Sequence, residues 1–88
     1  MYRVDFSPEA KKDLQQLQQS APKALAKLVV LLEELREHPR TGTGKCERLK
    51  YHEVETWSWR ITKEHRLVYQ IHDDVVEVLV ISTFGHYK

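Results

Sequence analysis

The sequence predicts an α+β domain: a short strand, a two-helix hairpin, and then three or four antiparallel strands. Two observations predict it. Apolar residues recur with helical spacing between residues 8 and 38, and the pattern changes to alternation of apolar and polar residues after residue 44. Consecutive helices followed by consecutive strands favour helices packed on one face of an antiparallel sheet. The 88 residues suit one small domain, which we place at 1–88.

The N-terminal half begins with an alternating stretch over residues 2–6, which predicts a short strand. Ser7 can cap a helix over residues 8–19, because its oxygen can accept a hydrogen bond from a first-turn amide, and Pro8 suits the first helical position. A Ser-Ala-Pro break separates this helix from a second one, which Pro39 ends, so the pair is predicted to form an antiparallel hairpin. The predicted buried face of the second helix consists of Leu25, Leu28, Val29, Leu32 and Leu35.

Strand alternation characterises the C-terminal half. Trp57, Trp59 and Ile61 share one face of a predicted strand, so both tryptophans are interpreted as core residues and not as platforms for bases. A polar turn follows, and the remaining strands pair through a further hairpin. The predicted fold therefore places its aromatic residues mainly between sheet and helices.

The last hairpin brings distant residues together. A tight Asp-Asp turn is predicted to join strands over residues 66–71 and 75–82. In that register Arg66 lies opposite Ile81, unless a β-bulge shifts the pairing by one residue. Gly85 permits a sharp bend after the final strand. We therefore expect Arg66 and His86 to lie within side-chain reach of each other.

Composition limits the classes of protein. The net charge is only +1, but residues 36–66 carry eight basic and five acidic side chains, so positive charge gathers in the middle of the chain. Such a focus suits a polyanionic partner, although solvated surface charges would give the same count. The single Cys46 excludes an internal disulfide and a zinc site of the usual Cys/His spacing. Without a signal peptide or a long apolar run, a cytoplasmic protein with no membrane partner is expected.

A possible chemistry is cleavage of RNA without a metal or other cofactor. This reaction needs a base for the 2′-hydroxyl, a cation for the charged phosphorane and an acid for the departing 5′-oxygen. Glu47 can be the base, Arg66 the bidentate phosphate clamp and His86 the acid. Lys50 can add positive charge near the base, and Tyr87 could stack on a nucleobase. Each residue also has a structural alternative, because exposed ion pairs and idle terminal histidines are common.

Three segments resemble the YoeB/Txe toxins of the RelE/ParE superfamily. They are the run Gly-Thr-Gly-Lys-Cys-Glu-Arg-Leu-Lys over residues 42–50, the run Trp-Ser-Trp-Arg-Ile-Thr-Lys-Glu-His-Arg-Leu-Val-Tyr over residues 57–69, and the terminal His86-Tyr87. The likeness is strongest over residues 35–87. It implies the RelE-like fold and a ribosome-dependent mRNA endonuclease that cuts in the A site and so inhibits translation.

The resemblance also implies roles and partners. Glu47 matches the general base, Arg66 the transition-state stabiliser and His86 the general acid, while Tyr87 helps to position the substrate. Basic residues that match RNA-facing positions are Lys45, Lys50 and Arg60. A YefM/Phd-type antitoxin would hold the toxin inactive, operator DNA would be bound only through the toxin–antitoxin complex, and a homodimer is expected. Ribosome and mRNA are the expected targets.

The sequence departs from the family at two positions. Trp59 stands where related toxins commonly carry a second arginine before Arg60, and Lys88 extends past the terminal His-Tyr pair. Two other classes of protein remain alternatives. A ParE-like toxin that binds DNA gyrase without catalysis would share the fold, and so would a purely structural module. The gyrase binder does not need the set of Glu47, Arg66 and His86, so loss of activity in these variants would separate the classes.

Overall fold

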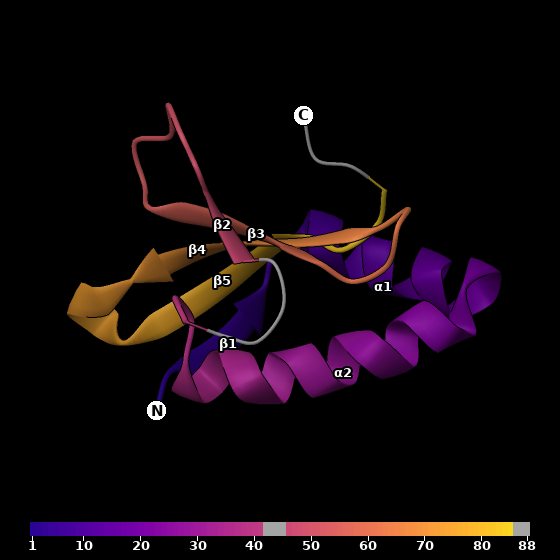
Figure 1. Cartoon of the computed structure of the whole chain (residues 1–88). Helices are drawn as coiled ribbons and strands as arrows, with labels where there is room; N and C mark the ends of the chain where they lie inside the picture. The colour runs from indigo at the N-terminus through magenta and orange to yellow at the C-terminus, as the bar shows by residue number, and fades with distance from the viewer. Residues whose placement is uncertain (42–45, 86–88) are drawn as a thin grey trace.

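The computed structural model describes residues 1–41 and 46–85. Its elements are β1 (Arg3–Phe6), α1 (Pro8–Ser20), α2 (Pro22–Glu37), β2 (Cys46–Leu49), β3 (Thr56–Arg60), β4 (Arg66–His72), the 3₁₀ turn η1 (Asp73–Val75) and β5 (Glu77–Ser82). The two helices lie on one side of a single sheet (Figure 1). The predicted α+β class and the helix hairpin are therefore confirmed.

The sheet has five strands in the order β1-β5-β4-β3-β2. Strands β2 to β5 form consecutive antiparallel pairs, as predicted, whereas β1 joins the other edge parallel to β5. The Ser7 amide donates to the carbonyl of Val80, and the Arg3 guanidinium pairs with the carboxylate of Glu77, both across this new pair. Local alternation predicts a strand at residues 2–6 but cannot say which distant edge it joins.

The predicted Asp-Asp turn is wrong in length. Residues 73–76 form the connection, which closes at Val76 in the left-handed region with a φ of 50°, so His72 pairs with Glu77. A register shift between Val68 and Tyr69 offsets the ladder once more. Arg66 therefore does not lie opposite Ile81. Its backbone amide instead donates to the carbonyl oxygen of Gly85 at 3.1 Å, which still places Arg66 beside the last described residue.

The core lies between the helices and the facing side of the sheet. Its fully or nearly fully buried apolar residues are Ala10, Leu17, Ala24, Leu28, Leu31, Leu35, Trp59, Ile61, Leu67, Tyr69, Ile71, Val78 and Val80. Trp57 packs at the edge of this cluster and is half-buried. The prediction that Val29 belongs to the buried face is wrong, because its side chain is 54% exposed. Helix α2 is apolar around most of its circumference, so spacing alone leaves its inward face ambiguous.

Arg40 links the segment after α2 to the residue before β3, Glu55, and to the residue after β4, Asp73. Its guanidinium donates to both oxygens of Glu55 at 2.7 and 2.8 Å and to Oδ2 of Asp73 at 2.7 Å. The Tyr2 hydroxyl donates to Oδ1 of Asp73 at 2.6 Å. The hydrogen bond from Arg40 is the main reason why the pKa of the Glu55 carboxyl lies below its ordinary value of 4.5. This cluster links four segments and fixes where the chain leaves α2 toward β2.

The Arg40 cluster predicts a dependence of stability on acid. Because the folded-state pKa of Glu55 is lowered, its contribution is fully present above pH 4.5 and is lost as the pH falls through the lower, folded-state value. Arg40→Met is expected to reduce the free energy of unfolding at pH 7 by about 1 kcal/mol, a low figure for charge-assisted bonds because the guanidinium is partly exposed. Urea denaturation at pH 7 and pH 3 measures both effects. The difference between wild type and variant should shrink at pH 3, and an undiminished difference would contradict this account.

Candidate active site

The sheet face turned away from the helices carries the candidate chemistry. Residues directly opposite each other in antiparallel strands share a face. Glu47 of β2 lies opposite Ser58 of β3, and Ser58 lies opposite Val68 of β4. Arg60 and Arg66 are partners at the end of the same β3–β4 pair. The neighbouring residues Trp59 and Leu67 point to the core, so Glu47 and both arginines share the opposite face.

Ser58 connects the acidic and basic candidates. The Nη1 atom of Arg66 donates to the Ser58 hydroxyl at 3.3 Å, while Glu47 is the cross-strand neighbour of the same serine. Ser58 is only 3% exposed, whereas Arg66 is half-buried and Glu47 is exposed. One terminal nitrogen of the Arg66 guanidinium is thus held by Ser58. A carboxylate and a guanidinium are therefore both neighbours of one small, buried residue on the same sheet face.

The segment after β5 returns to Arg66. Gly85 adopts a φ of +70°, so the bend predicted for this glycine is confirmed. Its amide donates to Nδ1 of His65 at 2.9 Å, and its carbonyl accepts from the Arg66 amide. Upstream, the backbone amide of Thr83 donates to Asp13 of α1 at 3.1 Å. Gly85, the last described residue, is therefore fixed beside Arg66.

The predicted site residues fall into three groups. Glu47, Arg60 and Arg66 share one sheet face, and Lys50 is exposed just beyond the end of β2. Lys45, His86 and Tyr87 lie outside the described residues. Sequence reasoning missed Ser58 and assigned no role to His65. Only the register of β2, β3 and β4 reveals Ser58, and no local pattern signals that the His65 ring accepts a bond from Gly85.

Cys46 belongs to the packing beneath this site. Its Sγ lies 3.0 Å from the Tyr69 hydroxyl, which donates to the carbonyl of Pro39 at 2.7 Å. Burial raises the pKa of the Cys46 thiol, so the sulfur stays protonated and is a poor nucleophile. Burial also raises the pKa of Tyr69, which keeps the hydroxyl as a donor. Within residues 1–41 and 46–85, no three His, Cys, Asp or Glu side chains gather in a way that could hold a metal ion.

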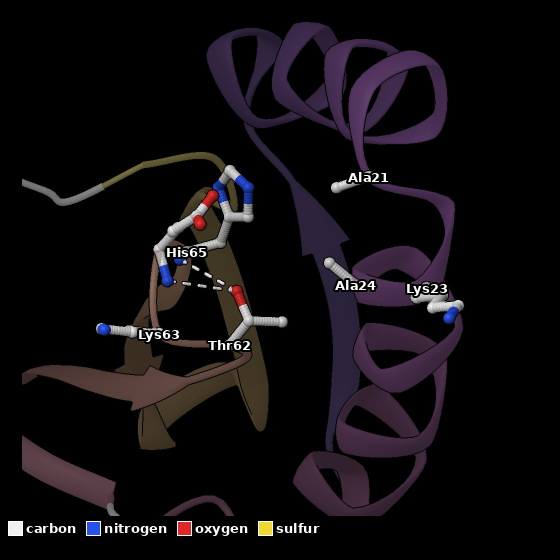
Figure 2. A pocket seen from close by; sticks show the side chains of 7 residues that line it. Ala21, Lys23, Ala24, Thr62, Lys63 and His65 are labelled. Carbon is white, nitrogen blue, oxygen red and sulfur yellow. Dashed lines mark hydrogen bonds between the residues drawn. The ribbon is translucent and has the colours of Figure 1, made fainter.

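A groove separates the start of α2 from the β3–β4 turn (Figure 2). Its lining consists of Ala21, Lys23, Ala24, Thr62, Lys63, Glu64 and His65. The Thr62 hydroxyl accepts hydrogen bonds from the backbone amides of Glu64 at 3.3 Å and His65 at 3.2 Å, which close the turn. His65 thus lies between this groove and the Gly85 segment.

Neither helix in the described ranges is long and apolar enough to cross a membrane.

Comparisons with known proteins agree with this architecture. A YoeB dimer from Staphylococcus aureus superposes with a TM-score of 0.83 at 34% identity, covering 98% of both chains. A heterotetrameric YoeB–YefM toxin–antitoxin complex from the same organism contains a chain with a TM-score of 0.80 at 34% identity, covering 99% of both. The fold is therefore that of a small bacterial toxin.

The family follows from the sequence comparisons. Toxin YoeB of Escherichia coli strain K12 is 37% identical over 85 residues, which cover 97% of this chain and 99% of the relative. The model of the YoeB-like toxins of bacterial type II toxin–antitoxin systems matches residues 6–87. The chain belongs to this family. The resemblance that the three sequence segments predicted is confirmed.

Proposed function

We propose that this toxin is an endoribonuclease that cuts mRNA in the ribosomal A site and thereby inhibits translation. The observation that carries the proposal is the placement of Glu47 and Arg66 around Ser58 on one sheet face. Family membership supports a toxin, and this pair supports the reaction. Arg60, the cross-strand partner of Arg66, adds a second cation at the same strand end.

The proposed reaction is an in-line transfer within the RNA. Glu47 takes the proton of the 2′-hydroxyl, whose oxygen attacks the adjacent phosphorus. Arg66 stabilises the added negative charge on the phosphorane oxygens. The bond to the 5′-oxygen then breaks, and His86 donates the proton that makes this oxygen a hydroxyl. The products carry a 2′,3′-cyclic phosphate and a 5′-hydroxyl. Side chains supply all three functions, so the proposal requires no catalytic metal.

Binding of the RNA is assigned to the basic residues around this pair. Arg60 and Lys50 are exposed, and we place phosphate contacts there and at Lys45. Tyr87 is proposed to position the substrate by stacking. Phosphate contacts depend on charge and not on base identity, so these residues set affinity more than sequence preference.

The proposed partners follow from the relatives. A YoeB from Staphylococcus aureus forms a complex with YefM and another structure is a YoeB dimer, so we propose a YefM/Phd-type antitoxin and a homodimer for this chain. Contact with operator DNA would occur only through the antitoxin complex. The ribosome and mRNA are the proposed targets, and a cytoplasmic location accords with them.

Primer extension on mRNA in purified ribosomes tests the function. The wild-type chain should cut within the A-site codon and should keep doing so when a chelator removes transition metals at constant Mg²⁺. Glu47→Gln and Arg66→Ala should each abolish most of the cutting. Arg48→Ala is the matched control, because Arg48 follows Glu47 in the same strand but lies opposite Trp57, on the other face. This control should cut like the wild type.

The absence of cutting by the wild type on programmed ribosomes would reject the endoribonuclease. Wild-type cutting by both the Glu47→Gln and the Arg66→Ala variants would reject the roles assigned to these two residues. Loss of cutting in the chelator would reject the metal-free reaction. If the wild type does not cut but inhibits supercoiling by DNA gyrase at stoichiometric amounts, the chain is instead a ParE-like gyrase toxin.

A further inference from the structure

Gly85 is held on both sides by adjacent residues of the β3–β4 hairpin. Its amide donates to Nδ1 of His65 at 2.9 Å, and its carbonyl accepts from the amide of Arg66 at 3.1 Å. Its φ of +70° orients both groups toward the hairpin. Gly85 immediately precedes His86, to which the proposed reaction assigns the role of acid. The hydrogen bonds on Gly85 therefore determine the point from which the chain continues to that acid.

The His65 ring is itself fixed. The residue is 8% exposed, and its ring lies 4.7 Å from the ring of Phe84, at an angle of 39°. Its amide donates to the Thr62 hydroxyl, and its carbonyl accepts from the amides of Ile61 and Thr62 at 3.0 and 3.1 Å. Few rotations remain to a ring that is buried on a closed turn. His65 is therefore a rigid reference for whatever binds to its Nδ1.

The bond to Gly85 defines the form of the imidazole. A ring nitrogen that accepts a hydrogen bond carries no proton, so the ring is neutral with its proton on Nε2. The hydrogen bond to Gly85 thus requires an acceptor atom at the position of Nδ1, and an aromatic ring without such an atom could not form it. This separates two contributions of His65: an acceptor atom for Gly85 and an apolar ring surface for Phe84.

We infer that His65 is a positioning residue for the proposed acid, acting through its Nδ1 bond to Gly85. This inference rests on the proposed function. The consecutive residues His65 and Arg66 bind the amide and the carbonyl of the same glycine. The proposed phosphate clamp, Arg66, and the residue that precedes the proposed acid, Gly85, are therefore held in a fixed position relative to each other. An error of about 1 Å in such a frame can cost roughly 100-fold in rate. A histidine that only filled space would not need its acceptor on this glycine.

Two substitutions separate the acceptor from the ring. In His65→Asn the Oδ1 atom stands where Nδ1 stood, so the acceptor stays while the ring surface is lost. In His65→Phe the ring surface stays while the acceptor is lost. Burial of an amide costs more than burial of a phenyl ring, so Asn should be the less stable variant. The rates should rank in the opposite order, which a purely structural role cannot produce.

The test is single-turnover cleavage of mRNA on programmed ribosomes with the full chain in excess. His65→Phe should lower the maximal rate by about 10- to 100-fold, while the concentration for half-maximal rate changes by less than about 3-fold. His65→Asn should keep its rate within about 5-fold of the wild type. Thermal unfolding of both variants should show that His65→Asn is the less stable one. Hydrogen exchange should show that the Gly85 amide exchanges faster in His65→Phe than in His65→Asn.

Several outcomes would overturn the role of His65. One is that rates follow stability, with Asn slower than Phe, and another is that Phe cuts like the wild type. A change confined to the half-maximal concentration would also reject it, since this indicates binding and not alignment. Absence of cutting by the wild type rejects the proposed function, and with it this role. If the wild type cuts, the difference in rate between His65→Asn and His65→Phe decides whether His65 has the role.

Discussion

Replacing Arg66 with lysine is expected to lower the single-turnover rate of mRNA cleavage by roughly 100-fold, the scale for removing a preorganised group that stabilises transition-state charge. The planar guanidinium can donate to Ser58 through Nη1 at 3.3 Å and still present other N–H groups to two phosphate oxygens. A lysine ammonium is a point charge on a flexible stem. It preserves the net charge but not the two-pronged geometry, so affinity for ribosome-bound RNA should change much less than the rate.

Two control variants show whether the Arg66→Lys loss arises from the geometry of the guanidinium. Ser58→Ala removes the hydroxyl that the guanidinium donates to and should slow cleavage by about 3- to 10-fold, the scale of one hydrogen bond. Arg48→Lys makes the same exchange on the opposite face of β2 and should have no effect. If Arg66→Lys cuts at the wild-type rate, the site uses only the charge of Arg66. Equal losses in the two lysine variants would instead indicate a general effect on the fold.

The helices show what local sequence determines. The Ser7 hydroxyl accepts a hydrogen bond from the Ala10 amide at 3.1 Å, so the predicted cap is confirmed, and α1 extends one residue beyond the predicted 8–19. Capping and proline effects act within one turn, and a sequence contains that information. The burial of Trp59 was predicted for the same reason, because the face to which a strand residue points is indicated by the residues two positions away.

The errors arise where distant residues decide. The turn after β4 is longer than predicted, and Asp73 at its start accepts hydrogen bonds from Tyr2 and Arg40, which lie 71 and 33 positions away in the chain. Such contacts form only in the folded protein, so a pattern read along residues 72–77 cannot include them. The parallel pairing of β1 and the outward position of Val29 have the same origin.

The candidate site divides in the same way. Side-chain chemistry and the resemblance identified Glu47 and Arg66 as candidates, and their roles stay predictions. Their placement around Ser58 depends on the register of three strands, which no single segment contains. The acceptor role of His65 depends on a bend twenty positions later, at Gly85. Family likeness therefore names reacting groups, while the residues that orient them come from the fold.

Trp59→Ala is expected to reduce the free energy of unfolding by about 3–5 kcal/mol, the range for removing a large aromatic side chain from a core. Trp59 is 1% exposed, lies between Cys46 and Leu67 in neighbouring strands, and belongs to the core shared with both helices. The Trp59 side chain points to the helices and away from Arg60, so the face proposed to bind RNA does not include this departure from the family.

Urea denaturation followed by circular dichroism measures this loss. A domain of this size has a stability of roughly 4–13 kcal/mol, so Trp59→Ala should unfold at far lower urea and leave little margin. Trp59→Phe keeps most of the buried surface and should lose less than half as much. Trp57→Ala is the matched control on the same face, since Trp57 is only half-buried at the edge of the core. Its loss should be smaller, although its Nε1 bond to Glu55 at 2.8 Å is also removed. Equal losses at the two tryptophans would contradict the assignment of Trp59 to the centre of the core, because the cost of truncation should follow the apolar surface removed from it.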